Sequence, residues 1–217
     1  LTNASPVSLK DVTPIARLTG DTQAIVVSAA SDIQTLGDLV EKLKADPGAV
    51  SWAGGSAGGT DHITVGLLAK AAGVDPTKIN YVAFSGGGEA MAAILGNQVT
   101  AGVSSIGEFS EQVKAGTMRL LAVSSADRLP GVDAPTIKEA GFDVVVQNGR
   151  MVAAAPGLTD EQKAKIVADI EKLNGSAGWT SMLETKGWAN TYLAGDAFTA
   201  QLEADIAATE TVLRDIG

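Results

Sequence analysis

The sequence contains no cysteine, and it has only one histidine, His62, among its 217 residues. Without cysteine there can be no disulfide, no thiolate nucleophile and no cysteine-ligated metal or cluster site. Basic residues are also scarce, because 16 Lys and Arg stand against 25 Asp and Glu, which gives a formal net charge of -9. That sign is wrong for a protein that holds phosphates by counterion release, so we expect no nucleic-acid partner.

Long apolar runs are absent as well. No stretch of about 18 uninterrupted apolar residues occurs, so no segment is expected to span a bilayer. The first residues, Leu1 to Pro6, have neither the basic start nor the apolar stretch of a secretory signal, which suggests a leader that has been removed or never existed. The chain does have 45% hydrophobic residues, enough for one large core or two small lobes.

Short apolar runs alternate with amphipathic segments along the first two thirds of the chain. Expected strands and helices follow one another as 23–28, 36–45, 50–53, 61–72, 79–84, 89–95, 99–104, 106–115 and 119–124. This alternation predicts a mainly parallel sheet with helices on both faces.

The pattern changes after Pro135. A short helix, an extended segment in two parts, two helices, a short strand and a long helix are expected at 136–140, 142–147 with 151–155, 159–173, 176–186, 189–193 and 196–216. The last helix carries one apolar stripe, yet the C-terminal third has too few strands to bury such faces as an independent domain.

A glycine-rich bend, 54–60, joins the expected strand 50–53 to the following helix. Gly54 to Gly58 fits GxSxG, the nucleophile elbow of α/β-hydrolases, which makes Ser56 a candidate nucleophile. Such an enzyme needs a base histidine far along the chain, after the acid, whereas His62 follows Ser56 by only six positions. A serine hydrolase is therefore the alternative hypothesis, and not the preferred one.

Phosphate-binding motifs fit the glycine clusters less well. The bend 54–60 lacks the lysine of a P-loop, and Gly86 to Gly88 is followed by Met91 where a dinucleotide fingerprint has its third glycine. Glycines do let backbone N–H groups point into a concavity, and a helix N-terminus adds roughly half a positive charge, so the bend favours an anion. A plain strand-to-helix turn, with Thr60 or Asp61 capping the helix, remains the alternative.

Two more bends follow expected strands, at 84–89 and 104–107. Because ligands of open parallel sheets bind outside the carboxyl ends of the strands, three such bends predict one polar pocket. His62 is expected near its rim and Trp52 in the core. Arg150 could meet a carboxylate with two hydrogen bonds or could be a solvated surface charge. No cluster of residues supports a metal site.

The order of motifs resembles the solute-binding proteins of tripartite tricarboxylate transporters. The resemblance rests on "VSWAGGSAGGTDHI", on "INYVAFSGGGEAMAAILGNQVTAGVSSIGEF" and on "AGTMRLLAVSSADRLPGVDAPTIKEAGFDV". It implies an α/β fold of the two-lobed, type II periplasmic-binding-protein kind. Such a protein captures a small di- or tricarboxylate outside the membrane, in the periplasm or as a surface lipoprotein, and passes it to a membrane permease. No enzyme activity and no cofactor are expected.

The resemblance also implies the ligand-binding positions, largely through backbone amides and ordered water. They are Ala53, Gly54, Gly55, Ser56, Ala57, Gly58, Gly59, Thr60, Ser85, Gly86, Gly87, Gly88, Ser104 and Ser105, to which we add His62 and Arg150. We expect residues 21–142 to form a complete second lobe. Residues 1–20 and 143–217 would form the hinge and part of a first lobe, because family members normally begin with further βα units.

Overall fold

The computed structural model describes residues 5–216, which divide into two compact units. Unit 1 comprises residues 5–21 and 148–211, and unit 2 comprises residues 22–147 and 212–216. The chain passes from one unit to the other within strand β1 (Thr13–Ser28), at the start of strand β6 (Gln147–Ala154) and near the end of helix α7 (Gly195–Ile216). The lobe boundaries expected from the sequence, at residues 21 and 142, stay a prediction.

Unit 2 is built on a mixed sheet with the strand order β3-β2-β4-β1-β5. Strands β2 (Ser51–Gly54), β3 (Asn80–Ala83) and β4 (Ala101–Ser105) pair in parallel, as the βα alternation predicts. Strand β1 runs antiparallel to both β4 and β5 (Met118–Val123), which corrects the expectation for that strand. The C-terminal end of β1 lies at the end of the sheet where β2 and β4 begin, so β1 runs in the opposite direction to those two strands.

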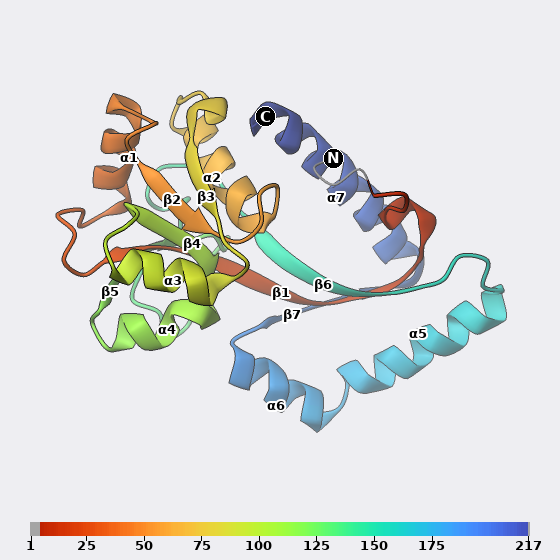
Figure 1. The fold of residues 1–217 in the computed structure, drawn as a ribbon. Coiled ribbons are helices and arrows are strands. Elements are labelled where there is room, and N and C mark those ends of the chain that lie inside the picture. The colour runs from red at the N-terminus through yellow and green to blue at the C-terminus, as the bar shows by residue number, and fades with distance from the viewer. Residues whose placement is uncertain (1–4, 217) are drawn as a thin grey trace. The chain divides into compact units, whose positions relative to one another are not determined.

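Helices cover both faces of this sheet (Figure 1). Helices α1 (Leu36–Ala45) and α2 (Thr60–Ala71) pack on one face with Trp52 and Ile25, and a 3₁₀ turn, η2 (Pro76–Lys78), follows α2. Helices α3 (Gly87–Leu95) and α4 (Ile106–Lys114) pack on the other face. Alternate residues of β1 serve the two cores, since Ile25 belongs to the first and Val26 to the second. The predicted α/β architecture is confirmed.

The segment after β5 differs from the prediction. Residues 136–140 form turns instead of a helix, with one isolated bridge between Val123 and Thr136, and residues 142–146 are not a strand. Thr136 and Glu139 cap each other as at a helix start, but Gly141, with φ 99°, ends the turn at once. The segment is nevertheless fixed to unit 2, because the Ser124 hydroxyl donates to Val146 O at 2.6 Å.

Unit 1 contains the first half of β1, which pairs with β6 and runs antiparallel to β7 (Ala189–Ala194). Its helices are a short 3₁₀ turn, η1 (Leu9–Asp11), followed by α5 (Asp160–Asn174), α6 (Ala177–Lys186) and most of α7 (Gly195–Ile216). Helix α5 contains no buried residue. Its Leu173 is 41% exposed, so α5 contributes little to the core of unit 1.

The last turn of α7 belongs to unit 2, where it packs on α2. Lys70 forms an ion pair with Asp215, and Gly66 leaves the space that the Ile216 side chain occupies. Within residues 5–216, no helix has the length and apolar character needed to cross a membrane.

Replacement of Gly66 by alanine is expected to lower the free energy of unfolding by about 1 kcal/mol, because overpacking outweighs the gain in helix propensity. The new Cβ would lie 2.3 Å from Ile216 Cγ2. Urea unfolding measures the change. Gly178→Ala is the control, since Gly178 lies in helix α6 with no heavy atom within 4 Å of an added Cβ. Equal stabilisation by both substitutions would contradict the packing of α7 on α2.

Candidate functional site

The three predicted bends lie at one edge of the unit 2 sheet. Strands β3, β2 and β4 are neighbours and parallel, so their carboxyl ends share that edge. The chain leaves β2 through α2 to reach β3 on one side, and leaves β3 through α3 to reach β4 on the other side of β2. This reversal of direction is the switch point at which open α/β sheets bind ligands.

The helices that start at this edge have no side-chain caps. Their N-cap residues are Gly59, Gly86 and Ser105, and none of them accepts a hydrogen bond from the first turn through a side chain. By contrast, Thr35, Thr159 and Ser176 cap α1, α5 and α6 in that way. Capping of α2 by Thr60 or Asp61, the alternative from the sequence, is therefore wrong. The helices α2, α3 and α4 therefore start without the N-cap side chain that α1, α5 and α6 have.

Side chains from α2 and β3 hold the glycine loop 55–59 in place. The Gly55 N–H donates to Asp61 Oδ2 at 2.8 Å, and the Tyr81 hydroxyl donates to Gly55 O at 2.9 Å. The Gly58 N–H donates to His62 Nδ1 at 3.1 Å. These bonds fix the backbone at both ends of the loop.

Only some of the backbone amides of the loop 55–59 are available to a ligand. Those of Gly55, Gly58 and Gly59 are used within the loop, the last donating to Ser56 O at 2.9 Å. In the described part of the chain, the amides of the exposed residues Ser56 and Ala57 have no acceptor. These two N–H groups are the donors that the loop can offer.

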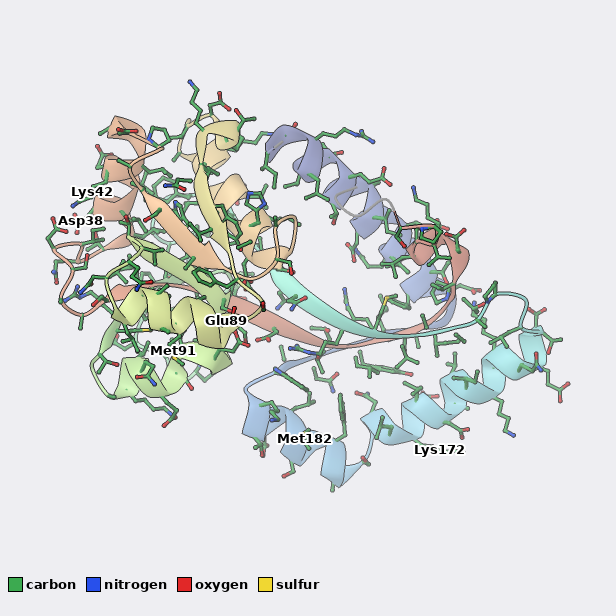
Figure 2. The ribbon with its side chains drawn as sticks, in the orientation of Figure 1. Asp38, Lys42, Glu89, Met91, Lys172 and Met182 are labelled. Atoms are coloured by element: carbon green, nitrogen blue, oxygen red, sulfur yellow. The ribbon has the colours of Figure 1, made fainter. Side chains whose placement is uncertain are left out.

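Acidic side chains accept hydrogen bonds from donors at the other two bends. The Ser85 N–H donates to Glu89 Oε2 at 3.1 Å, and the Ser104 hydroxyl donates to Glu108 Oε2. Figure 2 shows Glu89 in the first turn of α3. A negative charge at a helix N-terminus is favourable, but here it also reduces the positive potential that a ligand anion would meet. Neither carboxylate was predicted from the sequence, although an acidic residue in the first turn of each helix was the available signal.

Burial determines the protonation states of His62 and Tyr81, whose rings lie beside the loop. Burial lowers the pKa of His62, which keeps the imidazole neutral at pH 7 and able to accept through Nδ1. Burial, with the nearby Asp61 carboxylate, raises the pKa of Tyr81, so its hydroxyl stays protonated and donates. Tyr81 is a further site residue that was not predicted from the sequence, because an aromatic residue in a strand is usually part of the core.

Arg150 belongs to unit 1, whereas all other predicted site residues belong to unit 2. Its Nη2 donates to Asp21 Oδ2 at 3.1 Å, and its guanidinium lies 4.2 Å from the centroid of the Trp188 ring. Within residues 5–216, the buried Nη1 has no acceptor. Arg150 is therefore not a freely solvated charge, since a protein carboxylate and an indole ring hold it.

The serine hydrolase hypothesis fails on geometry. The imidazole that should serve as base uses its Nδ1 to accept the Gly58 N–H, and it stacks on Tyr81 with ring centroids 4.3 Å apart. The described residues show no hydrogen bond between His62 and Ser56.

Residues 5–216 contain no group of three or more His, Asp or Glu that could hold a metal ion.

A polar cavity of about 260 Å³ lies at the opposite end of β2. Its lining includes Ser51, the first residue of β2, and none of the predicted site residues. The cavity is therefore separate from the three bends.

The chain has the fold of the periplasmic-binding-protein class. A TctC solute-binding protein from Polaromonas has the same fold, with a TM-score of 0.78 and 26% identity over 98% of this chain and 73% of that one. The R. palustris protein Rpa4515, solved with adipate, gives a TM-score of 0.80 at 23% identity over 95% of this chain and 69% of that one.

The sequence comparisons identify the family. The family described as tripartite tricarboxylate transporter family receptor matches residues 2–210, so the chain belongs to that family. Protein BugT of Bordetella pertussis is 30% identical over 156 residues, which are 70% of this chain and 46% of BugT. The chain thus spans about half the length of that relative. The matched family is one of transporter receptors, and the Polaromonas protein is a solute-binding protein, so neither is described as an enzyme.

Proposed function

We propose that the protein is an extracytoplasmic receptor that captures a small di- or tricarboxylate and delivers it to a membrane permease. The observation that carries the proposal is the set of three uncapped helix N-termini at the carboxyl ends of adjacent parallel strands. A helix N-terminus carries a partial positive charge, which suits a carboxylate. The adipate bound by Rpa4515 supports this choice of ligand class.

In this proposal the amides of Ser56 and Ala57, with the bends 85–88 and 104–105, bind the ligand carboxylates. Glu89 and Glu108 already accept hydrogen bonds at two bends, so the ligand must bind beside them or displace them. The assignment of Arg150 to the ligand site remains a prediction.

Calorimetric titration with succinate, malate, citrate, adipate, glutamate and aspartate tests the proposal. We expect at least one to bind with a Kd of roughly 1 µM, equivalent to about 8 kcal/mol. The diamide of the ligand that binds best is the matched control, and it should give no heat because it lacks the carboxylate charge. Absence of heat from every carboxylate, with the protein shown to be folded by circular dichroism, would overturn the proposal.

Delivery to a permease needs a separate measurement in cells. Deletion of the gene should abolish uptake of the radiolabelled carboxylate that binds in calorimetry, and a plasmid copy should restore it. Unchanged uptake in the deletion strain would contradict the transport role.

A further inference from the structure

His62 lies in the first turn of α2 and touches the glycine loop without belonging to it. Its Nδ1 accepts the Gly58 N–H at 3.1 Å, and its ring stacks on Tyr81 at an interplanar angle of 27°. Gly58 itself has φ 75°, a left-handed conformation that glycine adopts easily. The imidazole therefore holds the loop at the residue with the left-handed backbone conformation.

Tyr81 supports the same loop from strand β3. Its ring is one side of the stack, and its hydroxyl donates to Gly55 O at 2.9 Å. The His62 and Tyr81 pair thus connects the two ends of the loop, at Gly58 and Gly55. Between these ends lie Ser56 and Ala57, whose amides are the loop's unengaged donors.

The hydrogen bond from Gly58 dictates the chemical form of the imidazole. A ring nitrogen can accept only when it carries no proton, so the neutral ring must bear its proton on Nε2. The imidazolium has N–H groups at both nitrogens and cannot accept. Protonation of His62 therefore replaces an attraction at Gly58 with two opposed donors.

We propose that His62 is a positioning residue that holds the loop 55–59 in its binding conformation through the Gly58 amide, and that protonation of its imidazole releases the loop. The effect on ligand affinity rests on the proposed function, but the state of the loop does not. His62 need not contact the ligand, because its Nδ1 is already used by the protein.

Of the titratable groups around His62, a carboxylate would favour the imidazolium, but burial is the cause that lowers the pKa of the ring and keeps it neutral. Tyr81 faces it from β3, and Asp61 is its neighbour on α2. Burial lowers the pKa of His62, so the folded protein binds fewer protons at this ring than the unfolded chain does. The contribution of His62 to the free energy of unfolding is therefore fully present above the unfolded pKa of about 6.5. It decreases as the pH falls below that value.

Calorimetric titration with succinate at pH 8, 7, 6 and 5 tests the inference, with His62→Gln as the matched control. Glutamine keeps an acceptor oxygen but does not titrate, so its pH curve reports protonation of succinate alone. Between pH 8 and pH 5, we expect the wild-type protein to lose about tenfold more of its affinity for succinate than the glutamine variant loses. Equal relative losses in the two proteins, or a larger loss in the variant, would overturn the inference.

A measurement without ligand separates this inference from the proposed function. His62 is the only histidine of the 217-residue sequence, so the tag-free chain gives one set of imidazole signals in long-range ¹H–¹⁵N NMR spectra. We expect the Nε2–H tautomer at pH 8, and a change in the Gly58 amide shift when the ring protonates. An Nδ1–H tautomer would overturn the inference even if carboxylates bind. If none binds, the NMR result still decides the role of His62.

Discussion

Replacement of Arg150 by methionine is expected to lower the free energy of unfolding by about 2 kcal/mol. The Asp21 side chain is only 2% exposed, and it loses the guanidinium nitrogen that now lies 3.1 Å away. Breaking a fully buried ion pair costs about 3–5 kcal/mol, and the value here is lower because water reaches the Arg150 side chain, which is 41% exposed. Methionine preserves much of the packing on Trp188. Urea unfolding measures the difference.

Two controls separate the buried charge from general effects of the substitution. Arg128→Met breaks the pair between Arg128 and Glu139, whose side chains are both solvent-accessible, and should cost at most about 1 kcal/mol. Asp21→Asn combined with Arg150→Met should recover most of the loss, because no buried charge remains. If Arg150→Met proves as mild as Arg128→Met, the Asp21 pair does not stabilise unit 1.

Replacement of Gly54 by alanine is expected to weaken both folding and carboxylate binding. A Cβ at this position would lie 2.3 Å from the Tyr81 hydroxyl oxygen and 3.0 Å from the main-chain Val103 O. The tyrosine would have to leave Gly55 O, and the neighbouring strand β4 cannot move away easily. Overpacking of this kind costs about 1–3 kcal/mol, and release of the loop should reduce succinate affinity by about tenfold.

The double variant Gly54→Ala, Tyr81→Phe tests the cause of that effect. Removing the hydroxyl relieves the closer clash, so the double variant should be more stable than Gly54→Ala alone. Its affinity should stay low, because the bond to Gly55 O is gone in both proteins. Wild-type affinity in Gly54→Ala would show that the Tyr81 contact does not position the loop.

The sequence predicted the elements of unit 2 closely. Helix 36–45 has the expected bounds, and the helices expected at 61–72, 89–95 and 106–115 begin or end within two residues of prediction. Glycines separate each strand from its helix, and apolar residues recur with helical spacing, so local chemistry specifies these segments. The length of β1 was missed because its buried residues Thr19, Asp21 and Thr22 are polar and interrupt an apolar pattern, and its direction depends on pairing with the distant strands β4 and β5.

The candidate site was predicted as a set of backbone positions, and the structure adds the side chains that hold them. Asp61 and His62 are six and four residues from the glycines that they bind, so a local motif could have suggested their contacts. Tyr81 is 26 residues from Gly55, and nothing in the sequence marks the pairing. It exists because β2 and β3 pair in parallel, with Trp52 opposite Tyr81.

By itself, the sequence determined the βα alternation of unit 2, the three bends and the family, because turn chemistry, apolar periodicity and motif order are local properties of the chain. Only the tertiary structure decided which groups each bend engages and that Arg150 meets Asp21, 129 residues away. Contacts between distant segments depend on strand order and register. These arise from packing the whole chain, and no single stretch of sequence specifies them.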